Sequence, residues 1–152
     1  MTKAELEIFL HEQIPLAQCM DISVKRLNDS GVILTAPLSK NKNDKNTGFA
    51  GALATLTTLS GWALATYIAE HLAKLSRDEF TVVASKSEIQ YLKPVTTNLI
   101  AHCEIPKQEV ITAFLGWLEK RGKARIHLSS QVVCDDGAVA VQFSGDFVVI
   151  RK

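Results

Sequence analysis

The longest hydrophobic pattern in the chain lies between residues 49 and 75. Phe49–Ala69 contains no charged residue and no proline. Its large apolar residues fall on every side of a helical wheel: Leu53, Leu56, Leu59, Trp62, Leu64, Tyr67 and Ile68. A helix that is apolar all round must be buried all round, in a protein core or in lipid. The pattern therefore predicts a buried helix over Phe49–Leu75, roughly 40 Å long, around which the rest of the chain is arranged.

About 20 apolar residues is also the length that crosses a membrane. Hydroxyl side chains dilute this segment below a typical span: Thr55, Thr57, Thr58, Ser60 and Thr66. Basic residues are not concentrated beside one end, as they are beside many spanning helices. We therefore expect a buried helix of a soluble protein and no membrane partner.

Before this helix, the pattern predicts one short helix and two strands. Thr2 and Glu5 have the spacing of a capping box, which indicates a short N-terminal helix. Strand-like patterns follow over Met20–Leu27 and Val32–Leu38. The sequence Asn28-Asp29-Ser30-Gly31 between them is typical of a hairpin turn.

After the helix, the pattern predicts four more strands and an inserted helix. The strands are Phe80–Leu92, Asn98–Ile105, Ala124–Cys134 and Val139–Ile150. Apolar residues recur at helical spacing within residues 107–121, which indicates a helix that ends at Gly122. Asp135-Asp136-Gly137 is the strongest hairpin signal in the chain.

The order of these elements indicates an α+β fold. Hairpin connections imply an antiparallel sheet, and one sheet can cover a helix only by curling around it. That arrangement is the hotdog fold, here predicted as a single domain over residues 1–152. One sheet leaves its edge strands unpaired and part of the helix uncovered. We therefore expect a homodimer, or alternatively a tetramer built from two such dimers.

Composition narrows the class of protein further. The net charge of +1 gives no reason to expect a nucleic-acid partner. Cys19, Cys103 and Cys134 are few, widely spaced and odd in number, which favours reduced thiols. The first ten residues include charged side chains and do not resemble a secretory leader. The histidines lack the spacing of metal ligands. We expect a cytoplasmic protein without a metal site.

Two segments resemble a known family. The first runs from Ala36-Pro37-Leu38 through Asn41, Asn43 and Thr47-Gly48-Phe49-Ala50-Gly51 to Gly61-Trp62, and the second is Ile89–Val95. Together they resemble the hotdog thioesterase domain that occurs alone or fused behind an acetyltransferase domain in bacteria. The resemblance covers nearly the whole chain. It implies hydrolysis of acyl-coenzyme A or acyl-carrier-protein thioesters at a dimer interface, without a cofactor.

The resemblance also implies site residues. A common pattern in the wider hotdog superfamily is Asn, then His-Gly-Gly six residues later, then Asp or Glu nine residues after the His. Asn43 matches the Asn and Gly51 matches the second Gly. Phe49 stands in the His position, Ala50 in the first Gly position and Thr58 in the carboxylate position. The match to the pattern is therefore partial, and the acidic group is missing.

This difference leaves the chemistry of the site open. The amides of Ala50 and Gly51 open a helix and can hold a thioester carbonyl, whatever their side chains. A hydroxyl at Thr58 cannot replace a carboxylate at neutral pH. Either another group is the base, or Asn43, Thr57 and Thr58 position the water, or the site binds thioesters without cleaving them.

The residues expected to line the substrate site are Asn41, Asn46, Thr47, Gly48, Phe49, Ala50 and Thr57, beside the catalytic candidates Asn43, Gly51 and Thr58. Structural roles are the alternative, because asparagine is common in turns and mid-helix hydroxyls often bond their own backbone. The leading function is a thioesterase. The alternatives are a non-catalytic acyl-thioester binding or regulatory module, or another hotdog chemistry such as dehydration or decarboxylation.

Overall fold

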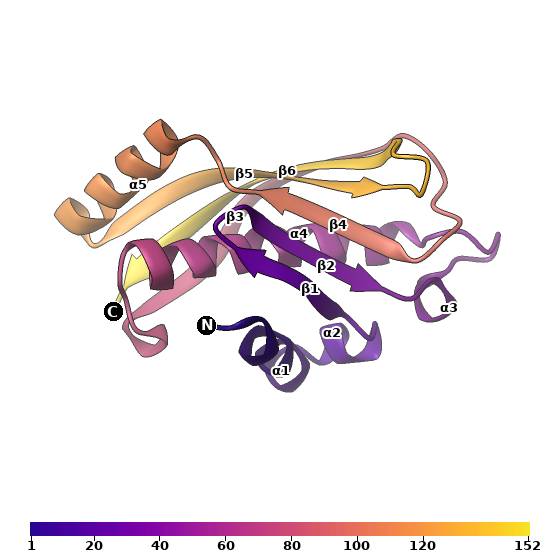
Figure 1. Ribbon diagram of the computed structural model, residues 1–152, viewed down its shortest axis with the longest axis horizontal. Coiled ribbons are helices and arrows are strands. Elements are labelled where there is room, and N and C mark those ends of the chain that lie inside the picture. The colour runs from indigo at the N-terminus through magenta and orange to yellow at the C-terminus, as the bar shows by residue number, and fades with distance from the viewer.

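A computed structural model describes residues 1–152 and shows one curved sheet around one central helix (Figure 1). The six strands pair antiparallel in the order β1-β2-β4-β5-β6-β3. Their bounds are Ser23–Asn28 (β1), Gly31–Ala36 (β2), Phe80–Tyr91 (β3), Leu99–Glu104 (β4), Lys123–Val133 (β5) and Val139–Arg151 (β6). The central helix α4 spans Ala50–Tyr67. The predicted α+β hotdog arrangement is confirmed.

Four more α-helices surround this unit: α1 (Lys3–Gln13), α2 (Pro15–Cys19), α3 (Leu38–Asn41) and α5 (Gln108–Arg121). The predicted capping box of α1 is present, with Thr2 and Glu5 each bonding the other's backbone amide. The sequence did not reveal α2 or α3, since each is too short to show a helical period. Gly122 ends α5 in the left-handed conformation, with φ of 68°.

The central helix ends earlier than predicted. It is α-helical to Tyr67, continues as a π-helix over Ile68–Leu72, and then leaves helical geometry. Lys74 has a left-handed φ of 57°, and the amide of Leu75 donates to the carbonyl oxygen of Ala69. Apolar periodicity continues through Leu75 because that side chain still packs into the core.

Residues Ala50–Leu72 are long and apolar enough to span a membrane by length and composition alone. In this fold, 78% of an 18-residue stretch of that segment is buried inside the chain, chiefly against the inner face of the sheet. Gly61 shows how closely helix and sheet approach. A Cβ atom at Gly61 would lie 2.5 Å from Cζ of Phe147 on β6, so only glycine fits there.

Burial of α4 is nevertheless incomplete along one face. Ala50 and Gly51 are exposed, and Ala54, Thr55, Thr58 and Trp62 are only half-buried. Positions at this spacing share one side of a helix. We call these six residues the open face of α4.

Strand β3 also has a free edge. It has twelve residues and pairs only with β6, so its other edge has no partner strand. Of those twelve, only Phe80 and Val82 are buried. An unpaired strand of this length is normally covered or blocked in a stable monomer. An uncovered part of the helix and an unpaired edge strand are the two features from which we expected a homodimer.

Candidate functional site

The N-terminus of α4 presents free backbone donors. No side chain caps this helix end. The amide of Phe49 donates to the Asn41 carbonyl oxygen at 2.8 Å, and the Phe49 carbonyl oxygen accepts from Leu53. The amides of Ala50, Gly51 and Ala52 have no acceptor within the chain. Such amides, at the positive end of the helix dipole, attract an anionic or carbonyl oxygen.

Phe49 lies over this helix start. A Cβ atom on Gly51 would fall 2.6 Å from Cε1 of the Phe49 ring, so the ring packs directly against the glycine. The ring is 54% exposed and has no polar atom, so it shapes the site without acid–base chemistry. Gly51 thus leaves room for an aromatic side chain beside a free amide.

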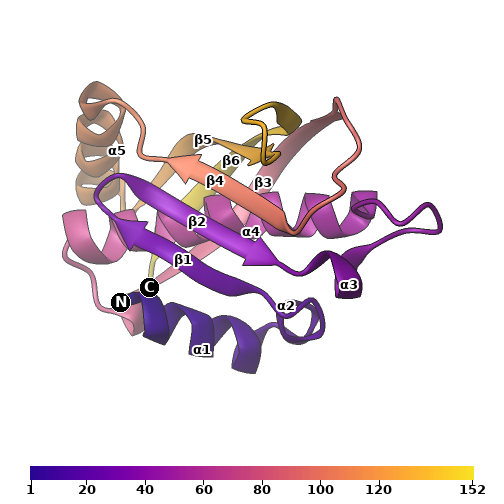
Figure 2. The ribbon, with the colours of Figure 1, turned by 45° about the vertical axis from the view of Figure 1, so that its right-hand side comes forward.

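Asn43 holds the loop that precedes α4. Its Oδ1 atom accepts from the amides of Lys45 and Thr47, at 2.9 and 3.1 Å. Its Nδ2 atom donates to Thr47 Oγ1 at 2.9 Å. Figure 2 shows this loop projecting beyond the sheet at the N-terminal end of α4. The Asn43 side chain therefore rigidifies the loop.

Other loop residues also anchor the backbone. Asn41 is buried, and its Nδ2 atom donates to the carbonyl oxygens of Met20 and Pro37. Asn46 has a left-handed φ of 60°, and Gly48 donates its amide to Val95 at 2.7 Å. These contacts fix the position of the loop and therefore the position at which α4 begins.

The two neighbouring threonines of α4 point in different directions. Thr57 is fully buried, and its hydroxyl donates to the carbonyl oxygen of Leu53 at 2.9 Å. Thr58 lies on the open face, and its hydroxyl makes no hydrogen bond within the chain. Of this pair, only Thr58 is placed on the side of α4 that a bound molecule can reach.

Tyr91 completes this end of the molecule, and sequence reasoning did not select it. Its hydroxyl donates to the Ala50 carbonyl oxygen at 3.1 Å, from the last residue of β3. Tyr91 lies in the Ile89–Val95 segment that carries the family resemblance, two positions after Ile89, so both residues share the face of β3 toward α4. That segment was the signal available in the sequence, but the resemblance assigned Tyr91 no role in the site.

Comparison with known proteins identifies the family to which this chain belongs. Residues 3–151 match the model of a family described as "Putative thioesterase (yiiD_Cterm)". The chain belongs to this thioesterase family. The match spans nearly the whole chain, as the resemblance in the sequence implied.

Three solved structures show the same fold. A Chlorobaculum tepidum protein of unknown function has 26% identity, a TM-score of 0.89, and coverage of 99% of this chain and 94% of that one. A Shewanella oneidensis protein described as "putative thioesterase" has 29% identity, a TM-score of 0.83, and coverage of 97% of this chain and 96% of that one. A Pseudomonas aeruginosa protein described as a probable thioesterase has 21% identity, a TM-score of 0.82, and coverage of 100% and 97%.

For a member of a thioesterase family, the open face of α4 lacks a conventional base. None of its six residues is a histidine or a carboxylate. Elsewhere, Nδ1 of His127 lies 2.7 Å from Oδ1 of Asp146, and this hydrogen bond lowers the pKa of Asp146. That pair lies on strands β5 and β6, on the face of the sheet that points away from α4. No three His, Cys, Asp or Glu side chains come together as a metal site would require.

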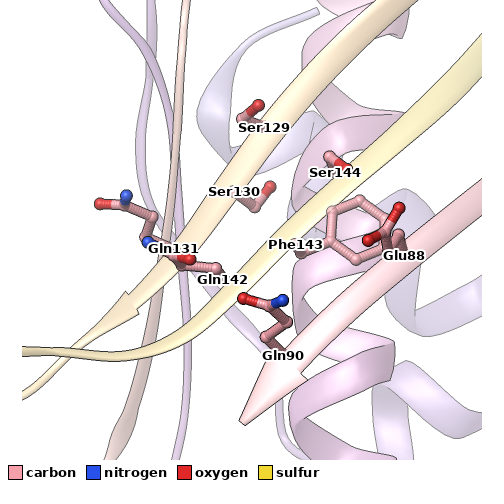
Figure 3. A pocket seen from close by; sticks show the side chains of 8 residues that line it. All are labelled: Glu88, Gln90, Ser129, Ser130, Gln131, Gln142, Phe143 and Ser144. Carbon is pink, nitrogen blue, oxygen red and sulfur yellow. The ribbon is translucent and has the colours of Figure 1, made fainter. Parts of the chain in front are cut away.

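A hollow of about 300 Å³ lies on the same outer face of the sheet (Figure 3). It is lined mainly by polar side chains of β3, β5 and β6, namely Glu88, Gln90, Ser129, Gln131, Gln142 and Ser144. None of the predicted site residues lines it. An outer sheet face of this kind is usually solvated, and the only carboxylate in the hollow is Glu88. The N-terminus of α4 remains the candidate site of this thioesterase family member.

Proposed function

We propose that the protein hydrolyses acyl-coenzyme A or acyl-carrier-protein thioesters at the N-terminus of α4, in a site completed by a second copy of the chain. The observation that carries the proposal is the set of unpaired amides at Ala50, Gly51 and Ala52 in a thioesterase family member. Three free cysteines are consistent with action in the cytoplasm.

The reaction assigns a clear task to those amides. Water attacks the thioester carbon, and negative charge develops on the carbonyl oxygen. The added water loses one proton, the tetrahedral intermediate collapses, and the carbon–sulfur bond breaks. The leaving thiolate takes up a proton, so the products are the carboxylic acid and the free thiol. Preorganised amides that donate to the developing oxyanion lower this barrier, typically by a few kcal/mol for each donor. Ala50 and Gly51 are exposed, so their amides are accessible to a substrate.

A second subunit is the natural completion of this site. The free edge of β3 ends at Tyr91, which itself contacts the first turn of α4. Pairing of two such edges would bring a second chain alongside the open face and exclude water from it. Exclusion of water strengthens each polar interaction with the substrate.

A non-catalytic acyl-thioester binding module is the second candidate, and one observation favours it. Thr58 occupies the position where the resemblance places a carboxylate, and no other acid lies on the open face. Binding through the amides needs no base, whereas hydrolysis needs a group that activates water. Measurement of thiol release and of binding on the same panel of acyl-coenzyme A thioesters separates the two candidates.

The substitution Ala50→Pro tests the amides directly. Ala50 is the first residue of α4, where proline fits the helix and removes only an unpaired amide. Phe49 has an extended backbone, which suits the residue before proline. We expect turnover to fall by roughly 100- to 1000-fold, the usual effect of one lost oxyanion donor. Gln108→Pro, at the first residue of α5, is the matched control and should leave turnover unchanged.

The result that contradicts the proposal is equally specific. If the wild-type protein releases no thiol from any thioester, it is not a thioesterase. If the wild-type protein does release thiol, and a folded Ala50→Pro variant retains full turnover, the Ala50 amide does not hold the oxyanion. Binding without turnover would favour the binding module.

A further inference from the structure

Trp62 is the last residue of the open face of α4, and its side chain is held in place by several contacts. Its indole stacks on Phe9 of α1, with ring centroids 5.6 Å apart and 12° between the planes. Its Nε1 atom donates to the Val82 carbonyl oxygen at 3.2 Å. The guanidinium of Arg77 lies 5.5 Å from the Trp62 centroid and 5.1 Å from that of Phe9. Contacts from three separate segments therefore fix the position of the indole.

The face of α4 changes character at Trp62. On its C-terminal side, Ala65 and Thr66 are fully buried, and α1 continues alongside until the Met1 carbonyl oxygen lies 3.3 Å from Nε2 of His71. On its N-terminal side, Thr55 and Thr58 are only half-buried. Trp62 thus marks the point where the cover provided by α1 stops.

Strand β3 runs along the open face and is tied to both of its ends. Tyr91 bonds the carbonyl oxygen of Ala50 at one end, and Val82 accepts from Trp62 at the other. The open face contains no charged side chain. The Thr55 hydroxyl donates to the Gly51 carbonyl oxygen at 2.9 Å, so it is already satisfied within the helix. An apolar chain laid along this face would leave that hydroxyl paired, and among the polar side-chain groups of the face only the Thr58 hydroxyl would lack a partner within the chain.

We propose that the acyl chain of the substrate lies along the open face, and that Trp62 sets its maximum length. This inference rests on the proposed function, which places the thioester carbonyl at the free amides beside Gly51. From Gly51 to Trp62 the helix rises about 16 Å at 1.5 Å per residue. An extended alkyl chain advances about 1.3 Å per carbon. The substrate class is therefore an acyl thioester of roughly a dozen carbons or fewer.

Hydrolysis of acyl-coenzyme A thioesters of graded length tests this limit. Butanoyl, octanoyl, dodecanoyl and hexadecanoyl thioesters span the range. For the wild-type protein, kcat/KM should rise to about the dodecanoyl thioester and fall by about tenfold or more at the hexadecanoyl thioester, because each buried methylene is worth about fourfold until the wall is met. Trp62→Ala should raise the ratio of hexadecanoyl to octanoyl kcat/KM by about tenfold or more.

Trp62→Leu provides a second variant in case the alanine variant does not fold, and a smaller shift in the same direction is expected. Trp117→Ala is the matched control, because Trp117 is an exposed tryptophan on α5. Its length preference should equal that of the wild type. An unchanged length preference in a folded Trp62 variant would overturn the inference while leaving the thioesterase proposal intact.

A binding series keeps the inference testable when there is no turnover. Alkyl-coenzyme A thioethers carry the same chain and cannot be hydrolysed. Their dissociation constants should fall by about fourfold per methylene, level off at the length that meets Trp62, and continue to fall in Trp62→Ala. Absence of any length dependence would show that another element, such as the facing helix of a second copy, fills the open face.

Discussion

The hydroxyl of Tyr91 donates a hydrogen bond to the carbonyl oxygen of Ala50 across 3.1 Å. This bond joins the last residue of the free edge strand β3 to the first residue of the central helix α4. The proposed dimer edge and the proposed oxyanion site are therefore in direct contact. A substitution at the end of β3 is therefore expected to alter the position of the first turn of α4, and the reverse.

Tyr91→Phe removes this bond and keeps the ring. A neutral hydrogen bond contributes about 0.5–1.5 kcal/mol, so we expect kcat to fall by about 2- to 10-fold as the first turn of α4 loses a restraint. Steady-state kinetics with an acyl-coenzyme A thioester measures the effect. Tyr67→Phe is the control, because its hydroxyl bonds Asp29 at 2.8 Å, beyond the open face, and should alter stability without altering kcat. Equal losses of kcat in the two variants would remove Tyr91 from the site.

Thr58→Asp restores the acidic group that the superfamily pattern carries at this position. Thr58 lies on the open face with an unpaired hydroxyl, so a carboxylate fits there without breaking a hydrogen bond. We expect hydrolysis to increase by about 10-fold or more, within the range of general base catalysis, if the carboxylate faces a thioester held at the free amides of the second copy. Thr55→Asp, on the same face but nearer the helix start, is the matched control and should not increase the rate. No gain from either substitution would show that Thr58 does not face the reacting carbon.

Asn43→Ala is expected to lower turnover because it loosens the loop before α4. Its side chain makes four hydrogen bonds to Lys45 and Thr47, so its loss frees the segment that leads into α4. We expect a fall of about 10-fold or more from misplacement of the site, with increased proteolysis of the loop. Asp44→Ala, in the same exposed turn, is the control. If loop proteolysis stays at the wild-type level while turnover falls, Asn43 acts on the substrate and its effect does not arise from the loop.

The fold was predictable because its signals are long and repeated. The uncharged run that starts at Phe49 predicted the central helix. The turn sequences Asp135-Asp136-Gly137 and Asn28–Gly31 predicted the two hairpins. Gly137 has a left-handed φ of 82°, as glycine does at the end of a three-residue hairpin loop, whereas Asp135 and Asp136 lack the positive φ that a type I′ turn demands. Short elements were missed for the opposite reason, since α2 and α3 span only five and four residues.

The site was less predictable, because side-chain direction depends on contacts between distant segments. Sequence spacing grouped Thr57 with Thr58, yet a rotation of about 100° per residue sends one into the core and the other to the open face. Asparagine in a loop suits both a catalytic and a structural role, and within one subunit Asn41 and Asn43 have structural partners. Tyr91 reaches Ala50 across 41 positions, a relationship that no local pattern contains.

Cys103 gives a prediction about alkaline stability. Burial raises the pKa of this thiol from 9.0 to about 11. Between these values the unfolded thiol loses its proton while the folded thiol keeps it, so the free energy of unfolding falls as pH rises. We expect a fall of about 2–3 kcal/mol across that window, measured by urea unfolding. Cys103→Ala should remove this part of the fall, whereas Cys134→Ala should not. Identical pH profiles for wild type and Cys103→Ala would contradict the assignment.

Two glycine substitutions test how closely α4 approaches the sheet. Gly61→Ala would place Cβ 2.5 Å from Cζ of the buried Phe147, so the ring or the helix must move. Overpacking of this kind costs about 1–3 kcal/mol, and urea unfolding should show it. Gly116→Ala is the matched control, since nothing lies within 4 Å of a Cβ there and the residue is inside α5. That substitution should stabilise the protein by about 0.5–1 kcal/mol. A neutral effect of Gly61→Ala would mean that the helix and β6 do not pack as closely as these distances require.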